Sequence, residues 1–460
     1  MKLLSAVVPA ASIALAIGSM GIAHAETTDT AKIRDLEKKL ERSMELIDQL
    51  SKKLDQIERT NTAPRAAAAS PEQSAKIEQL EKSISEIGSS LSRRGDDSGL
   101  PVHGFADVGL AHSGENNATF KGRKGGTVGT FDLYLTPQFG SNVKSLVELN
   151  FEVDRDGGVG TDLERAQIGY TFSDSATGWM GRFHTPYGYW NTGFHHGAQI
   201  QTSINRPMFL DFEDKGGILP AHSTGLWLTG SMGGASGKFG YDAYVANAPQ
   251  INGTASPSVL SGINPTDFNT NVNAGKYAGS GTLDMRMAGS TTNRNSVGFN
   301  AWFEPRSVDG LRLGAHGLRA EVVDDSADAN RTRLNMLGGY LVYLSDPWEI
   351  LGEYYGFRNQ DLSGSTGTHS SWAAYGQVGY NIGKWTPFAR AERTDLDQKD
   401  NYFAVQESGR SYKRFAVGVR YDVDPKAAIK VELDSTRKED LGAGNNDTFT
   451  DARVQYSIRF

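Results

Sequence analysis

The chain has 460 residues, of which 38% are hydrophobic, 22% charged and 10% aromatic, and 53 are glycine. It contains no cysteine, which excludes a disulfide scaffold, a thiolate metal site and cysteine catalysis. The formal net charge of −7 argues against nucleic acid as a partner, because phosphate binding requires a basic surface. After residue 25, no stretch approaches the roughly 20 apolar residues that a helix needs to cross a bilayer, which excludes a polytopic helical membrane protein.

Residues 1–25 have the pattern of a secretory signal peptide. Lys2 gives a positive start, an apolar run follows, and Ala23-His24-Ala25 forms a cleavage site of small residues. A membrane anchor is the alternative, but glycine and serine interrupt the apolar run. We therefore expect cleavage after Ala25, and the absence of a following cysteine excludes a lipoprotein anchor.

Residues 26–60 repeat apolar positions about every 3.5 residues, which is the spacing of a coiled coil. Isoleucine and leucine are mixed along the seam, which favours three strands over two. We predict a coiled coil that joins a homotrimer; a single amphipathic helix packed on the main domain is the alternative. The seam residues are Ile33, Leu36, Leu40, Ile47, Leu50, Leu54 and Ile57. A linker is predicted at 61–75, a second short coiled coil at 76–94 and another linker at 95–101.

From residue 102 to residue 460 the apolar period changes to two, which is the period of β-strands. In the last strand, Val454, Tyr456, Ile458 and Phe460 alternate with polar residues. About 16 such strands can be counted, and their connections alternate between short and long. An up-and-down barrel in an outer membrane has this alternation, whereas a soluble sandwich has no reason for it. The predicted fold class is an all-β membrane barrel of about 16 antiparallel strands, preceded by an N-terminal α-helical coiled coil.

The sequence resembles Gram-negative outer-membrane porins of the trimeric 16-stranded superfamily. The resemblance rests on the signal peptide, the terminal Tyr456-x-Ile458-x-Phe460 motif, the strand number and the long segment 186–222. The stretch 181–188 is loosely similar to a strand-to-loop pattern of the phosphate-selective porin O and P family. The resemblance implies that segment 186–222 folds into the lumen and narrows it. It also implies that Tyr456, Ile458 and Phe460 form the signal that the barrel-assembly machinery reads.

Charged residues on the predicted inner face and in segment 186–222 are candidates for a pore constriction. An arginine-lined wall opposite the acidic cluster of the segment would set a transverse field that separates solutes by charge. The alternative is that these groups form the solvated, mutually paired interior of a wide barrel. The candidates are Arg165, Arg182, Arg206, Asp211, Glu213, Asp214, Arg390, Arg414 and Arg420.

The sequence shows no motif of a catalytic or cofactor site, so we predict no enzyme activity, no cofactor and no metal. His184, His195, His196 and His222 match no known metal-ligand spacing. A barrel enzyme stays open as an alternative, because its site can be assembled from distant strands.

The predicted function is a water-filled channel in the Gram-negative outer membrane for passive diffusion of small hydrophilic solutes or ions. One alternative is a substrate-selective channel for a sugar or for an anion such as phosphate or a dicarboxylate. Another is a structural barrel that tethers the outer membrane to the cell wall, and a third is a sheath for an electron-transfer cytochrome. The expected partners are outer-membrane lipid, the barrel-assembly machinery and two further copies of the chain. Peptidoglycan is a candidate partner of the coiled coil, which we expect in the periplasm.

Overall fold

The computed structural model describes the part of the chain that follows the predicted coiled coils. The predicted signal peptide, both coiled-coil segments, their linkers and Asp214, His195 and His196 lie outside the described residues. The described residues are 102–114, 124–139, 141–153, 159–194, 197–213, 217–252, 282–284, 294–324, 331–363, 366–404, 406, 409–439 and 448–460.

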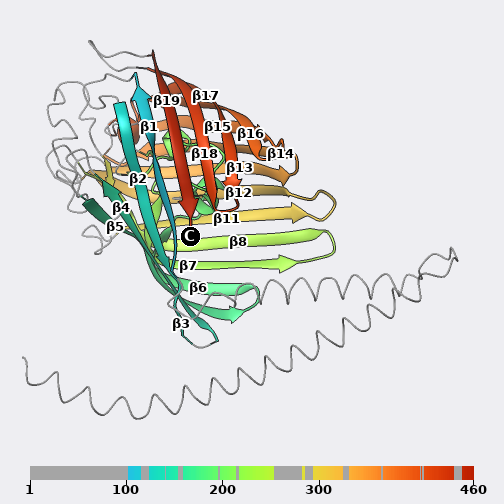
Figure 1. Ribbon diagram of the computed structural model, residues 1–460. Coiled ribbons are helices and arrows are strands. Elements are labelled where there is room, and N and C mark those ends of the chain that lie inside the picture. Colours follow the sequence, from blue (N-terminus) through green and yellow to red (C-terminus); the bar gives the residue numbers. More distant parts are fainter. Residues whose placement is uncertain are drawn as a thin grey trace, which may run out of the picture. The chain divides into compact units, whose positions relative to one another are not determined.

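Sixteen long antiparallel strands form a closed barrel (Figure 1). They are β1 (Val102–Ser113), β2 (Lys124–Leu135), β4 (Val143–Val153), β5 (Val159–Ser173), β6 (Ala176–His184), β7 (His222–Gly233), β8 (Gly237–Asn247), β11 (Asn295–Pro305), β12 (Leu311–Asp324), β13 (Arg331–Ser345), β14 (Trp348–Asp361), β15 (Thr368–Tyr380), β16 (Trp385–Asp395), β17 (Tyr412–Asp424), β18 (Ala427–Lys438) and β19 (Thr448–Arg459). Three short strands accompany them: β3 (Gln138–Phe139), β9 (Gln250–Asn252) and β10 (Thr282–Asp284). The predicted number of strands and their antiparallel order are confirmed.

The first and last strands close the barrel. β1 pairs with β19 over nine residues, from Phe105 opposite Arg459 to Ser113 opposite Asp451. The backbone of Phe460 exchanges two hydrogen bonds with Gly104, of 3.0 and 3.1 Å. The ring of Phe460 lies over Gly104, where a Cβ atom would meet it at 2.3 Å. Glycine at position 104 therefore allows the terminal ring to stack on Phe131, with 5.7 Å between the ring centroids.

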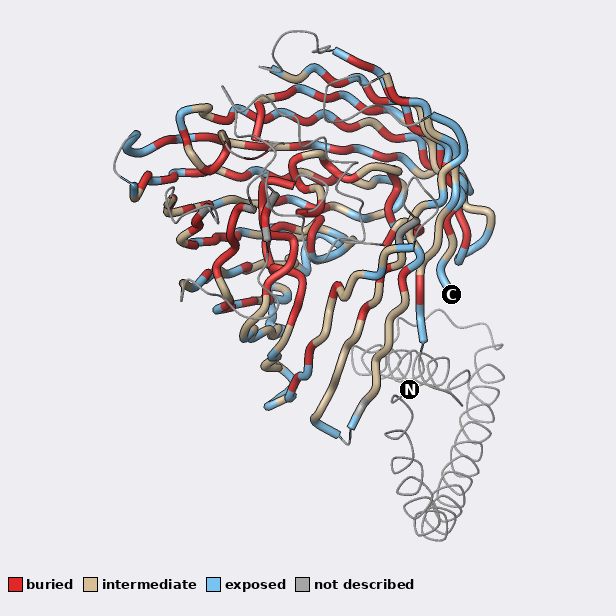
Figure 2. Tube along the Cα trace, turned by 90° about the vertical axis from the view of Figure 1, so that its left-hand side faces the viewer, coloured by how far each residue is buried: buried red, intermediate tan, exposed pale blue. Residues whose placement is uncertain are grey.

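The two faces of the barrel wall have inverted polarity: buried and exposed residues alternate along the strands (Figure 2), and many of the exposed ones are apolar. On β19, Val454 and Tyr456 are 40% and 43% exposed, whereas the neighbouring Gln455 and Ser457 are buried. Exposed and buried residues alternate along most of the other strands as well, with large apolar side chains outward. Most inward side chains are polar, but on β12 to β14 apolar residues such as Leu351 and Phe357 also point inward. The predicted assignment of faces is therefore confirmed. No helix in the described part of the chain has the length and hydropathy needed to span a bilayer.

Two connections fold into the interior of the barrel. The first, residues 185–221 between β6 and β7, contains α4 (Trp190–Gly193) and the 3-10 helix η1 (Met208–Leu210). The second, between β16 and β17, contains α5 (Asn401–Ala404). Their aromatic residues pack with apolar side chains on the inner face of β12, β13 and β14 to form one core cluster. We call residues 185–221 the inserted segment; its predicted place inside the barrel is confirmed by the contacts described next.

Candidate functional site

The inserted segment turns inward directly after β6. Pro186 follows Thr185, and proline cannot donate a strand hydrogen bond. Gly188 has a φ angle of +60°, and a Cβ atom there would lie 2.2 Å from both a carboxylate oxygen of Glu353 and the hydroxyl of Tyr355. Glycine is therefore required for the backbone conformation and for the close approach to the wall.

The first attachment point is Glu353 on β14, whose carboxylate accepts four hydrogen bonds. The backbone N–H groups of Tyr189 and Trp190 donate to it at 3.1 and 2.7 Å. The hydroxyls of Tyr355 and Tyr375 donate at 2.6 and 2.7 Å. Because Glu353 is buried, these donors replace the water that its charge would otherwise need.

The second attachment point uses lysine and arginine side chains that bind carbonyl groups of the segment. Lys430 on β18 donates to the carbonyl oxygens of Ala198 and Ser203, the latter at 3.1 Å. Arg420 on β17 donates to the carbonyl oxygen of Gln201 at 2.9 Å. This part of the segment has neither a helix nor a strand, so the wall satisfies its backbone acceptors.

Arg390 on β16 makes the most extensive of these contacts. Its guanidinium donates to the carbonyl oxygen of Asn205 at 2.7 Å and to the hydroxyl of Ser203 at 2.9 Å. It also donates to Glu392 at 2.8 Å and to the carbonyl oxygen of Arg206 at 3.4 Å. The planar fork of arginine can serve several acceptors at once, which a lysine cannot do in the same geometry.

Acidic side chains of the same wall bind the N–H groups of the segment. Glu432 accepts from the backbone of Ile204 at 2.5 Å and from the side chain of Asn205 at 2.8 Å. Glu392 accepts from the backbone of Met208 at 2.8 Å. The wall of β16 to β18 therefore presents bases to the segment's carbonyls and acids to its N–H groups.

Apolar packing holds the part of the segment around η1. Phe209, Leu210 and Ile218 are almost completely buried. The ring of Phe209 lies 5.3 Å from that of Tyr355, and the hydroxyl of Tyr402 donates to the carbonyl oxygen of Ile218 at 2.6 Å. Full burial of such side chains stabilises a fold by roughly 1.5–3 kcal/mol each, so this core adds substantially to the polar contacts.

The segment ends at an imidazole between two carboxylates. The Nδ1 atom of His222 lies 3.1 Å from Glu213, and its Nε2 atom lies 2.6 Å from Glu164. A ring that donates to both carboxylates is an imidazolium. Burial alone would raise the pKa of the Glu213 carboxyl, but His222 and Arg182 outweigh burial and hold the pKa below its ordinary value.

Arg206 lies beside this group and is buried. Its guanidinium carbon is 3.9 Å from the centre of the Phe212 ring, which in turn stacks on His222 with an interplanar angle of 15°. Burial lowers the pKa of Arg206, and the charge of Asp211 partly opposes this shift. The structure thus brings Arg182, Arg206, Asp211 and Glu213 together at the end of the segment.

Arg165 lies on the inner face of β5. It binds the buried carboxylate of Glu148, which also lies 3.2 Å from the Nε2 atom of His184. The pairing of β4 with β5 shifts register at Glu148, so that Glu164 is an extra residue beside Arg165. This bulge breaks the period of two and turns both Glu164 and Arg165 towards the interior.

The predicted constriction arginines differ in their access to solvent. The side chains of Arg390, Arg414 and Arg420 are 0%, 8% and 12% exposed, and Arg182 is 8% exposed. Arg414 binds Asp434 at 2.6 Å, whereas Arg390 and Arg420 bind the inserted segment. The Arg165 side chain, at 21%, has the greatest exposure of these five.

Sequence reasoning missed three residues that organise this interior. Glu353 was not predicted, because the inner face of β14 also carries Leu351 and Phe357 and gives no polar alternation. Glu164 was missed because of the bulge, and His222 was considered only as a metal ligand. Among the described residues, no group of three or more histidine, aspartate or glutamate side chains is arranged to hold a metal ion.

No protein-family model and no curated protein matches the sequence. The fold is similar to that of an anion-selective porin from Comamonas acidovorans, with a TM-score of 0.51 and 12% identity over 78% of this chain and 98% of that one. The outer-membrane channel DcaP of Acinetobacter baumannii gives a TM-score of 0.46, with 12% identity over 78% of this chain and 96% of that one. Salmonella typhi OmpF, solved in complex with daunomycin, gives a TM-score of 0.47, with 12% identity over 78% of this chain and 97% of that one. At this identity, the similarity to the Comamonas porin concerns the fold alone.

Proposed function

We propose that the protein is an outer-membrane porin that forms a water-filled channel for passive diffusion of small hydrophilic solutes or ions. The observation that carries this proposal is the inverted polarity of the closed barrel. Outward side chains such as Leu337 and Phe172 are 64% and 67% exposed, while charged residues such as Glu432 and Lys430 are completely buried inside. An apolar outer face is stable against lipid hydrocarbon, and polar groups inside can line an aqueous path.

The same proposal implies an oligomeric state, an orientation in the membrane and partners for the chain. The resemblance to trimeric porins and the heptad seam at 26–60 support a homotrimer, with the coiled coil in the periplasm and near peptidoglycan. The short turns of the barrel lie at the end that holds Val102 and Phe460, which supports a periplasmic position of that end. The terminal Tyr456, Ile458 and Phe460 are proposed as the signal for the barrel-assembly machinery.

We further propose that the channel prefers anions and that Arg165 supplies the preference. Arg165 pairs with the buried Glu148 but keeps the greatest exposure of the five arginines compared above, whereas the wall carboxylates Glu353, Glu392 and Glu432 bind the inserted segment. The similar Comamonas porin is described as anion-selective, which supports the same direction. Small anions such as phosphate or a dicarboxylate are the proposed solutes.

Planar-bilayer recording in a salt gradient tests both proposals. The wild-type chain should form pores whose reversal potential shows anion preference. One unit charge about 8 Å from an ion, at an effective dielectric constant of about 40, lowers the energy of an anion and raises that of a cation by about 1 kcal/mol each. Arg165→Gln should therefore lower the anion-over-cation permeability ratio roughly thirtyfold. Arg319→Gln, which changes an exposed arginine on β12, is the matched control.

The outcomes separate the two proposals. A chain that inserts but never conducts contradicts the channel. Pores whose reversal potential is the same in the wild type and in Arg165→Gln contradict the role of Arg165 and leave the channel intact.

A further inference from the structure

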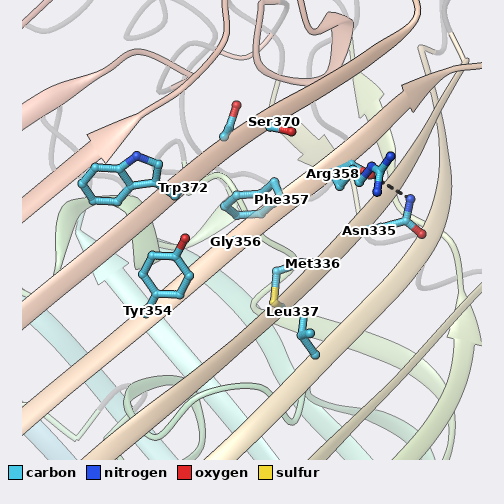
Figure 3. Close-up of a pocket in the computed structure, with 10 residues that line it drawn as sticks. Asn335, Met336, Leu337, Tyr354, Gly356, Phe357, Arg358, Ser370 and Trp372 are labelled. Carbon is cyan, nitrogen blue, oxygen red and sulfur yellow. Dashed lines mark hydrogen bonds between the residues drawn. The ribbon is translucent and has the colours of Figure 1, made fainter.

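The outer wall of the barrel carries a groove of about 470 Å³ across β13, β14 and β15 (Figure 3). Its lining is apolar and aromatic at one end and polar at the other. The lining residues used below are Asn335, Leu337, Tyr354, Gly356, Arg358 and Trp372.

The groove opens to the outside of the barrel. Leu337 and Tyr354 are 64% and 51% exposed. Their strand neighbours point the other way: Glu353 and Tyr355, on either side of Tyr354, are buried in the interior. Since successive residues of a strand face opposite sides, the lining side chains of Tyr354 and Arg358 face outward.

Gly356 forms the floor of the groove. A Cβ atom at this position would lie 3.3 Å from the Tyr354 ring, so a larger side chain would occupy the space. The rings of Tyr354 and Trp372 lie nearly parallel beside it, with centroids 6.3 Å apart (Figure 3). Together with Leu337, they form an apolar bed open to the surroundings.

The polar end of the groove lies towards the long-connection ends of the strands. Arg358 is four residues nearer that end of β14 than Tyr354, and its carbonyl oxygen accepts a hydrogen bond of 2.9 Å from the side chain of Asn335. Arg393 on β16 pairs with Ala374, level with Tyr354, and its guanidinium carbon lies 5.3 Å from the Trp372 ring. Its charge is therefore beside the apolar bed, and Arg358 is the cation at the polar end. Asp395, which pairs with Trp372 across the strands, adds a negative charge next to Arg393 on β16, so a phosphate is favoured on the Arg358 side of the groove.

We propose that this groove binds one phosphate-bearing lipid of the outer leaflet, with an acyl chain on Leu337, Tyr354 and Trp372 and the phosphate on Arg358. The inference rests on the proposed membrane position of the barrel. The order of chemistry along the strands matches such a lipid: the apolar bed lies towards the middle of the wall, and the cation lies towards its long-loop rim. Arginine suits phosphate because its fork can donate two hydrogen bonds to it.

Native mass spectrometry of the full chain in detergent tests the proposal, with hexa-acylated lipid A as the probe. Two comparison ligands are used. One is dephosphorylated lipid A, and the other is inorganic phosphate alone. Arg358→Gln should weaken lipid A binding about tenfold, the usual value of one charge-assisted hydrogen bond. Gly356→Phe should weaken it similarly by filling the floor.

Two control variants change the same residue types on the outer face without entering the groove. Arg437→Gln removes an exposed arginine of β18. Gly376→Phe adds a ring on β15 where a Cβ atom meets open space. Both should bind lipid A as the wild type does.

Several results would overturn the proposal. These are equal affinity of the wild type, Arg358→Gln and Gly356→Phe for lipid A, equal binding of the dephosphorylated lipid, or equal binding of inorganic phosphate alone. Loss of an oligomer in Gly356→Phe would show instead that a second copy covers the groove. The measurement reads lipid binding and not current, so a chain that binds the lipid but does not conduct contradicts the channel and not the groove.

Discussion

The Glu353 carboxylate on β14 accepts a hydrogen bond of 2.7 Å from the backbone N–H of Trp190, which precedes it by 163 residues in the chain. This contact joins the start of the inserted segment to the opposite wall of the barrel. Side chains of β14 to β18 bind backbone groups of the segment from Trp190 to Met208, in addition to the hydrogen bonds of the segment's own turns. The wall therefore holds the segment in position, and in the proposed channel that position would set the width of the passage.

We predict that Glu353→Gln loosens the inserted segment. The amide keeps one acceptor oxygen but presents an NH₂ group to donors, and the N–H groups of Tyr189 and Trp190 cannot reverse their roles. Loss of one charged hydrogen bond in a buried site costs about 1.5–3 kcal/mol. The variant should show faster proteolysis of the segment and larger current fluctuations.

Glu321→Gln is the matched control for that variant. Glu321 is half-exposed on β12 and binds Arg294 at 2.6 Å, and such surface pairs contribute about 0–1 kcal/mol. Equal proteolysis rates of the two variants would show that Glu353 does not hold the segment.

We predict that Arg390→Lys raises the single-channel conductance. Lysine keeps the positive charge but loses the fork that binds Asn205, Ser203 and Glu392 together. The segment should move away from β16 more often and widen the passage. Arg420→Lys should have a smaller effect on the conductance, because Arg420 is partly exposed and is also paired with Asp422. If both variants keep the wild-type conductance, the segment lies outside the conducting path.

The faces of the strands could be predicted because their signal is local. Alternation along β19 assigned Tyr456 to the outside and Gln455 to the inside, and both assignments agree with their burial. Alternation fails where the backbone changes period. At the β5 bulge, Glu164 and Arg165 both turn inward, although consecutive residues of a regular strand cannot do so.

The roles of the inward charges could not be predicted, because they depend on partners far away in the sequence. Arg390 and Arg420 were expected to line a constriction, and they bind backbone atoms of residues 201–206. Glu353 receives donors from Trp190 and Tyr375, which no spacing rule relates to it. A period of two shows which side chains face the interior. Whether such a side chain lines the lumen or binds the inserted segment depends on how the segment folds.

We predict that Phe460→Ala lowers the amount of folded barrel without changing the conductance of the pores that form. The Phe460 ring stacks on Phe131 and covers Gly104 at the closing seam. Such an aromatic pair contributes about 0.5–1.5 kcal/mol. Heat-modifiable mobility in gel electrophoresis should show less folded protein. Phe415→Ala, which removes a 53% exposed outward ring from β17, should fold normally; if it loses as much folded protein as Phe460→Ala, the seam has no special role.

The contact between Glu213 and His222 predicts a dependence of the segment on acid pH. Glu213 accepts a hydrogen bond of 2.7 Å from the backbone N–H of His222 and faces its ring. Other titratable and charged groups around the pair are Arg182, Arg206, Glu164, Asp162 and His184. The pKa of the Glu213 carboxyl is held below its unfolded value of 4.5, so the contact stabilises the folded segment at pH values above 4.5. That stabilisation is lost as the pH falls from 4.5 through the lower, folded-state pKa.

We therefore expect the wild-type segment to become more accessible to an acid protease below pH 4.5. Other carboxylates also titrate in this range, so the informative quantity is the difference between the wild type and Glu213→Gln. In the variant, position 213 cannot ionise, and the end of the segment should be looser already at pH 7. The two proteolysis rates should then converge as the pH falls through the lowered, folded-state pKa of the Glu213 carboxyl. A constant ratio of the two rates from pH 7 to pH 3 would mean that ionised Glu213 does not hold the segment, and that the aromatic contact of Phe212 with His222 carries the attachment instead.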